Sequence, residues 1–143
     1  MNSSTLRERS ERVVEELQLF PDAEERLFEV IRRGKVSPGL DAVKKTEDRL
    51  VPGCVSNLYL VAGMDDGKCR FSSDADAFIT KGVAALVCWV YDGAPANEIV
   101  ELPVDFIERA GIQGLLSPNR ANGLSQLLAR IRGFARTQLS AVS

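Results

Sequence analysis

The chain has 143 residues, of which 45% are hydrophobic and 27% charged, a composition typical of a globular protein. The formal net charge of −2 argues against a protein that coats the phosphate backbone of nucleic acid. No apolar run approaches the roughly 20 residues of a membrane-spanning helix, and the N-terminal stretch has no apolar segment typical of a signal peptide. We therefore expect one cytoplasmic domain over residues 1–143, with no nucleic-acid or membrane partner.

The first 49 residues predict two helices and a loop. A charged helix over residues 1–18 has one apolar stripe, formed by Leu6, Val13, Val14 and Leu17. A second helix begins after Asp22, because an aspartate followed three residues later by Glu25 is a capping-box pattern. Gly34 is expected to end this helix. Residues 35–49 are polar and contain Pro-Gly, so we expect a loop.

The periodicity then changes to that of β-structure. Apolar and other residues alternate over 58–62 and again over 68–71, and the sequence MDDGK between them is typical of a tight turn. These features predict a β-hairpin. The short stretch 49–51 is a candidate third strand, which would join the hairpin through a turn at Pro52 and Gly53.

The second half of the chain is predicted to be helical. Ser73 or Asp74 could cap a helix whose segment 83–91 is apolar on all sides, which indicates a buried central helix. Short helices are expected after the next two prolines. A long final helix should begin at Ser117, a favourable N-cap, followed by proline at the first helical position. Together these elements predict an α+β fold, with a small antiparallel β-sheet of about three strands packed against several α-helices.

The absence of histidine limits the chemistry that the chain can perform. It excludes Ser-His-Asp and Cys-His pairs and every metal site that needs a histidine ligand. The three cysteines form no Cys-x-x-Cys pair, so a disulfide framework is not expected. Cys88 lies in the apolar helix and Cys69 on a strand, where both are predicted to pack in the core. Cys54 instead follows Pro52-Gly53 and is the candidate functional thiol, because reactive cysteines must be accessible.

Four stretches, in this order, resemble the SufE family of sulfur-acceptor proteins. The first is VPGCVSNLY at 51–59, close to the family pattern V-P-G-C-Q-S-Q-V-W around its sulfur-carrying cysteine. The others are DADAFITKGV at 74–83, VYDG at 90–93 leading into Glu98-Ile99, and LSPNRANGL at 116–124. The resemblance covers about residues 20–134. It implies a SufE/IscU-like fold, in agreement with the predicted elements.

The resemblance also implies a role. Cys54 would take sulfur, as a persulfide, from a cysteine desulfurase of the SufS or CsdA type, stimulate that enzyme, and deliver the sulfur to an iron–sulfur assembly scaffold such as the SufBCD complex. The chain would be an accessory protein and not itself an enzyme. It would bind no cofactor, because the pyridoxal phosphate belongs to the desulfurase. Arg120 and Asp76 match a motif arginine and an acid near the cysteine loop, and Ser56 is a further supporting candidate.

Departures from the family pattern at Val55, Asn57 and Tyr59 leave the choice of desulfurase open. Two other functions stay open as well. The chain could be an IscU-like scaffold that holds an Fe–S cluster on its three cysteines and an acid such as Asp76. It could also be a redox-sensor module in which oxidation of Cys54 is the signal.

Overall fold

The computed structural model describes residues 5–53, 57–102 and 105–142. The described helices and strands, in chain order, are α1 (Thr5–Gln18), α2 (Ala23–Val36), β1 (Leu58–Asp65), β2 (Lys68–Ala75), α3 (Phe78–Tyr91), α4 (Ala96–Glu101), α5 (Phe106–Arg109) and α6 (Pro118–Val142). Three short 3₁₀ turns lie at Ala42–Lys44, Glu47–Arg49 and Gln113–Leu115. The predicted α+β fold is confirmed.

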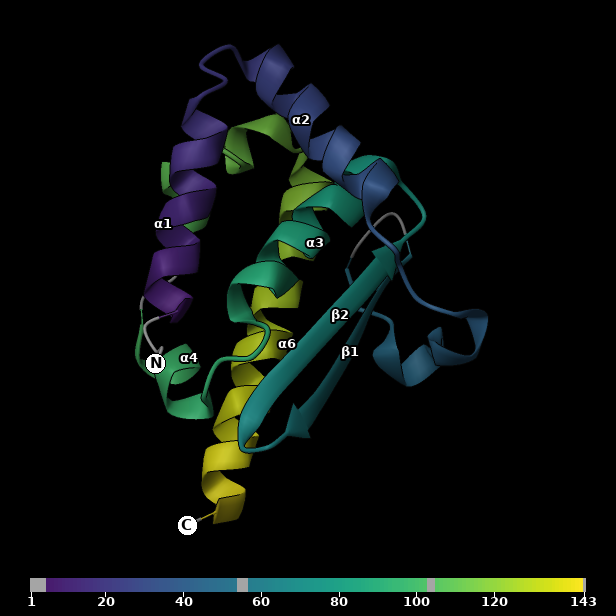
Figure 1. The fold of residues 1–143 in the computed structure, drawn as a ribbon. Helices are drawn as coiled ribbons and strands as arrows, with labels where there is room; N and C mark the ends of the chain where they lie inside the picture. The colour runs from purple at the N-terminus through teal and green to yellow at the C-terminus, as the bar shows by residue number, and fades with distance from the viewer. Residues whose placement is uncertain (1–4, 54–56, 103–104, 143) are drawn as a thin grey trace.

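Helix α3 lies at the centre of the molecule. It contacts β2 on one side and α1 on the other, with α2 crossing near its N-terminal end and α6 behind (Figure 1). Helix α6 also packs against β1 and α4. Most of α3 is buried, as its apolar sequence predicts. The core between these elements is filled by large side chains, among them Leu17, Leu58, Val87, Ile99, Phe106, Leu127 and Ile131.

The two strands form the predicted antiparallel hairpin. Leu58 pairs with Ala75 at the open end, and Asp65 pairs with Lys68 at the turn. The two turn residues, Asp66 and Gly67, both have positive φ, which is the conformation of a type I′ turn. The predicted third strand is wrong in extent: in the described part of the chain it is a single bridge between Leu50 and Tyr59.

The expected cap of α3 is also wrong. Ser73 and Asp74 lie in β2, and α3 begins only at Phe78. Both side chains are buried. Asp74 accepts a hydrogen bond from the Leu40 N–H (3.0 Å) and pairs with Lys45 (3.1 Å). These partners from the 35–49 loop outweigh the tendency of aspartate to start a helix.

Gly34 does not end α2, which continues to Val36. Instead Gly34 lies against Gly82 of α3. A Cβ atom on Gly34 would approach the Phe78 carbonyl oxygen to 2.1 Å, and one on Gly82 would approach the Val30 carbonyl oxygen to 2.0 Å. The two glycines therefore let the backbones of α2 and α3 approach closely near the N-terminal half of α3.

Candidate functional site

The chain enters the candidate site at the edge of the hairpin. The Val51 N–H donates a hydrogen bond to the Leu58 carbonyl oxygen at 2.7 Å. The chain then leaves the hairpin through Pro52 and Gly53, where φ is +80°. Such a φ favours glycine, so the Pro-Gly pair suits the predicted turn. Cys54 and Ser56, the predicted thiol and its supporting hydroxyl, lie outside the described residues.

The residues on either side of segment 54–56 are both anchored. On one side the Asn122 side-chain amide donates a hydrogen bond to the Gly53 carbonyl oxygen at 2.9 Å. On the other side the Asp76 N–H donates to the Asn57 carbonyl oxygen at 3.1 Å. Cys54 follows Gly53 directly in the chain. The predicted thiol therefore belongs to a short segment tied at one end to α6 and at the other to the entrance of α3.

The first turn of α6 brings Arg120 to the same region. Ser117 caps the helix as predicted, and its hydroxyl oxygen accepts a hydrogen bond from the Arg120 N–H at 3.3 Å. The Arg120 side chain lines a small recess of about 10 Å³, together with residues of β1, α3 and α6: Leu58, Thr80, Val83, Ala84, Leu116, Leu124 and Leu127. A recess of that size is about large enough for one water molecule.

The side chain of Arg120 has an unfavourable environment in this recess. Its Nε atom is buried and has no hydrogen-bond partner within residues 5–53, 57–102 and 105–142. Leaving a buried polar group unsatisfied typically costs about 1–3 kcal/mol. Such a cation in apolar surroundings is suited to an anion that approaches it.

The structure places Asp76 beside the same segment, but only through its backbone. Its side chain is exposed, and its carboxylate has no hydrogen bond or ion pair to any described residue. The neighbouring Asp74 has the opposite environment, with Lys45 and Lys81 beside its carboxylate. Burial acts to raise the pKa of Asp74, but the hydrogen bond from Leu40 and the nearby lysines outweigh it, so the pKa is lowered.

The other two thiols are buried, as the sequence predicts. Burial raises the pKa of the Cys69 thiol, and it raises the pKa of Cys88 to about 12 even though Ser73 hydrogen-bonds to it. Only the thiolate is an effective nucleophile or metal ligand. The described residues also contain no group of three Cys, Asp or Glu side chains that could hold a metal ion. Neither Cys69 nor Cys88 is therefore suited to chemistry in this structure.

Sequence reasoning missed Asn122. It lies in the LSPNRANGL motif, near the start of α6, and the motif pointed only to the arginine. An asparagine that precedes glycine in a helix is a weak helix former. That poor local propensity is a signal of a tertiary role, which the contact with Gly53 supplies.

The comparisons with known proteins agree with this architecture. The SufE family model, described as an Fe–S metabolism associated domain, matches residues 11–135. A SufE-like protein of Synechocystis sp. is 37% identical over 86% of this chain and 77% of its own length. A SufE-like protein of Rhizobium etli is 32% identical over 92% of each chain.

A solved structure has the same fold. It is the solution structure of a hypothetical protein from Thermus thermophilus, with a TM-score of 0.75 and 22% sequence identity, and the match covers 92% of this chain and 96% of the other.

The fold and the matched sequence together define a small α+β domain of iron–sulfur metabolism. This chain belongs to the SufE family, as its four motifs predict. No helix in the described ranges is long and apolar enough to span a membrane.

Proposed function

We propose that this chain is a sulfur-acceptor protein that carries sulfur as a persulfide on Cys54. The observation that carries the proposal is local. In a chain of the SufE family, Cys54 directly follows Gly53, whose carbonyl oxygen Asn122 holds. The same first turns of α6 carry Arg120, a half-buried arginine whose buried Nε has no partner among the described residues. Burial of Cys69 and Cys88 leaves Cys54 as the remaining thiol suited to reaction.

The proposed reaction is an exchange between two sulfur atoms. The Cys54 thiolate attacks the outer sulfur of a persulfide on the cysteine desulfurase. The S–S bond of that persulfide breaks, a new S–S bond forms on Cys54, and the desulfurase cysteine leaves as a thiolate. One disulfide-type bond is exchanged for another, so no oxidant or reductant is consumed. The freed desulfurase thiolate can accept the next sulfur, which accounts for the stimulation of that enzyme.

Arg120 and Asn122 have distinct roles in this proposal. The guanidinium of Arg120 favours the thiolate form of Cys54 through its positive charge. Asn122 is a positioning residue that holds the Gly53 carbonyl, and with it the chain that leads to Cys54. Ser56 and Asp76 are proposed as supporting groups, a hydroxyl donor to the thiolate and an exposed acid facing the partner.

The partners follow from the same chemistry. The donor is a SufS- or CsdA-type cysteine desulfurase, which supplies both the sulfur and the pyridoxal phosphate. The acceptor is an iron–sulfur assembly scaffold such as the SufBCD complex. This chain contributes the thiol and the surface around it, as an accessory protein.

The test is a mass measurement. The chain is incubated with a SufS-type desulfurase and L-cysteine, and intact masses are taken of the wild type, of Cys54→Ser and of Cys69→Ala as a matched control. We expect the mass of one added sulfur atom, lost on reduction, in the wild type and in Cys69→Ala but absent from Cys54→Ser. An adduct that persists in Cys54→Ser would overturn the assignment. A coloured, stoichiometric Fe–S cluster after reconstitution would favour the scaffold, and oxidation of Cys54 by peroxide without sulfur uptake would favour the sensor.

A further inference from the structure

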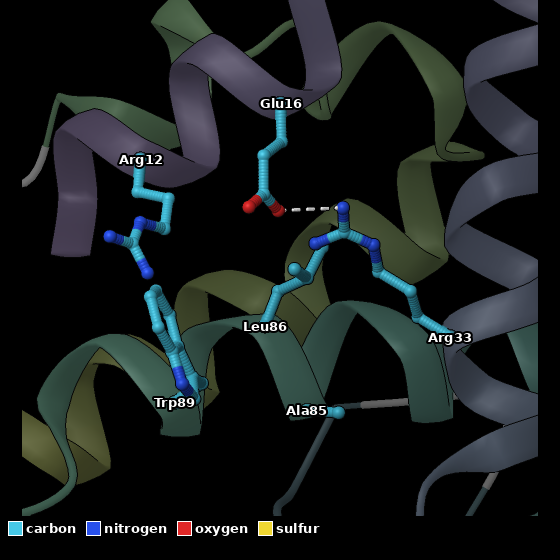
Figure 2. A pocket seen from close by; sticks show the side chains of 6 residues that line it. All are labelled: Arg12, Glu16, Arg33, Ala85, Leu86 and Trp89. Atoms are coloured by element: carbon cyan, nitrogen blue, oxygen red, sulfur yellow. Dashed lines mark hydrogen bonds and ion pairs between the residues drawn. The ribbon is translucent and has the colours of Figure 1, made fainter.

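A hollow in the surface is lined by Trp89, the chain's only tryptophan. It has a volume of about 320 Å³ and lies between α1, α2 and α3 (Figure 2). Ala85, Leu86 and Trp89 of α3 form its apolar floor, and Arg12, Glu16 and Arg33 form its sides. Trp89 is 41% exposed in a helix that is otherwise largely buried.

Two further hollows share the Trp89 side chain. One of about 280 Å³ extends along α1 past Glu8 and Arg9. The other, of about 210 Å³, extends past Asp92 toward β2 and the loop at Pro38. The indole therefore stands where three depressions of the surface meet. Tryptophan is one of the residue types enriched at the energetic centre of protein–protein interfaces.

The three hollows around Trp89 are here called the groove. Some of the charged side chains around it have a partner, and Arg12 has none among the described residues. Arg33 pairs with Glu16 at 2.9 Å and with Glu29 at 2.7 Å. Arg9 lies over the indole, 5.4 Å from the ring centroid, and donates a hydrogen bond to the Trp89 carbonyl oxygen at 2.9 Å. Arg12 extends toward the indole from α1 (Figure 2) and makes no ion pair or hydrogen bond with any described residue.

We propose that this groove is a docking site for a segment of a partner protein that carries one apolar side chain close to one carboxylate. The apolar side chain packs on Trp89, Ala85 and Leu86, and the carboxylate pairs with Arg12. A basic segment would be repelled by Arg9 and Arg12. A nucleic acid would meet the carboxylates of Glu8 and Glu16 in the same hollows.

This surface is separate from the proposed sulfur-carrying segment and does not depend on it. Asp76, which anchors that segment, precedes the N-terminus of α3, whereas Trp89 lies near its C-terminus. Trp89 lies eleven residues after Phe78 in the helix, which corresponds to roughly 16 Å along the axis. A partner could therefore occupy the groove while Cys54 is engaged elsewhere.

The test uses capped peptides of alanine and serine that contain one leucine and, at one of several spacings after it, one glutamate. Matched peptides carry glutamine or lysine in place of the glutamate. Because the chain has a single tryptophan, its indole N–H gives one identifiable cross-peak in a ¹⁵N–¹H spectrum. Binding is followed by the shift of this peak at low ionic strength, where exposed charges are least screened.

We expect saturable shifts of the indole peak with a glutamate peptide and weaker binding with its lysine counterpart. Arg12→Glu should reverse this order, with a change of about fivefold in each affinity, the upper range for an exposed ion pair. Arg7→Glu makes the same charge change on the exposed side of α1, outside the hollows, and should leave both affinities unchanged. The backbone spectrum of each variant shows whether it is folded.

Three outcomes would overturn the proposal: no saturable shift with any glutamate peptide, equal binding of glutamate and lysine peptides, or equal effects of Arg12→Glu and Arg7→Glu. Concentration-dependent self-association that Trp89→Ala abolishes would assign the groove to a second copy instead. Each of these results is independent of the mass experiment on Cys54, so failure of one proposal leaves the other standing.

Discussion

The two ends of α3 present opposite environments. Near its N-terminus, Gly34 and Gly82 bring α2 against α3, and Arg120 has a buried Nε without a partner among the described residues. Near its C-terminus the helices diverge and leave Trp89 and Arg12 in an open groove. A charge that is not surrounded by water acts more strongly on its neighbours than an exposed one. The N-terminal end, here called the closed end, is therefore suited to stabilising the thiolate form of a nearby thiol. The C-terminal end, the open end, is suited to recognising a partner.

The largest expected effect is on the close contact between α2 and α3 at the closed end. In Gly82→Ala the new Cβ would meet the Val30 carbonyl oxygen at 2.0 Å, so one helix must move. We expect the free energy of unfolding to fall by about 3 kcal/mol, the upper range for overpacking. Gly133→Ala is the matched control, because a Cβ there meets nothing within 4 Å. It should stabilise α6 by about 0.5–1 kcal/mol. Denaturant titration measures both, and equal values would contradict the close packing.

Two aspartates allow a second comparison of the ends. The side chain of Asp74 is 9% exposed, and that of Asp92, which pairs with Arg70, is 30% exposed. We expect Asp74→Asn to lower the free energy of unfolding by about 2 kcal/mol and Asp92→Asn by about 1 kcal/mol. Removing the charge of a carboxylate that accepts hydrogen bonds costs more stability where the carboxylate is buried.

The pH dependence of Asp74 has a definite sign. Its folded pKa is lowered, so its contribution is complete above the unfolded pKa and is lost as pH falls through the folded one. The difference between wild type and Asp74→Asn should therefore be constant near neutrality and shrink below about pH 4. A difference that grows on acidification would show that the carboxylate does not act through its charge.

The elements of the fold follow closely from the sequence, and two of the errors share one cause. Helix α2, the hairpin and α6 begin or turn where local patterns predict, because Asp22, Gly67 and Ser117 act through neighbours in the chain. Asp74 and Gly34 were assigned the wrong roles because their partners come from distant segments: the loop at Leu40 and Lys45 for one, α3 for the other.

The features of the candidate sites divide in the same way, into those that local sequence patterns reveal and those that depend on distant segments. Cys54 is apparent from the sequence because it belongs to no periodic apolar pattern. Arg120 is apparent through the resemblance to the family. The environment of the Arg120 Nε, which has no partner in the described part of the chain, depends on how α6 packs on β1. The contact of Asn122 with Gly53 depends on the same packing, which no local pattern encodes. The Trp89 groove was missed because the segment 83–91 is apolar throughout, so its one exposed position is not apparent from the sequence.

Removing Arg120, whose Nε is buried, should affect the proposed sulfur transfer more than removing an exposed arginine. Loss of the Arg120 charge should lower the thiolate fraction of Cys54 near neutral pH by about tenfold, the lower end of the effect of a nearby opposite charge. A more basic thiolate is intrinsically more reactive, which offsets about threefold of this loss. We therefore expect persulfide formation to slow by about threefold near pH 7. At a pH where the thiol is fully ionised in both proteins, the deficit should reverse, because the more basic thiolate of the variant is the more reactive one.

Arg7→Ala is the matched control for this experiment, because it removes an exposed arginine of α1 that lies outside the hollows around Trp89. Its rate of persulfide formation should equal that of the wild type at every pH. A deficit in Arg120→Ala that does not change with pH would indicate a structural role, and a wild-type rate would remove Arg120 from the mechanism.

The smallest expected effect concerns Asn122, which acts on the backbone before Cys54 and not on the thiol itself. Its hydrogen bond to Gly53 is exposed, so Asn122→Ala should slow persulfide formation only about twofold, within the usual worth of one such bond. The pH at which the rate is half-maximal should not move, in contrast to Arg120→Ala.

The same contact constrains Gly53: a Cβ there would lie 2.6 Å from the Asn122 side-chain nitrogen, in addition to the strain of a positive φ. Gly53→Ala should consequently be less harmful to the rate in an Asn122→Ala background than in the wild type. Strictly additive effects of the two substitutions would mean that Asn122 does not position this turn, and the closed end of α3 would then act on Cys54 through the charge of Arg120 alone.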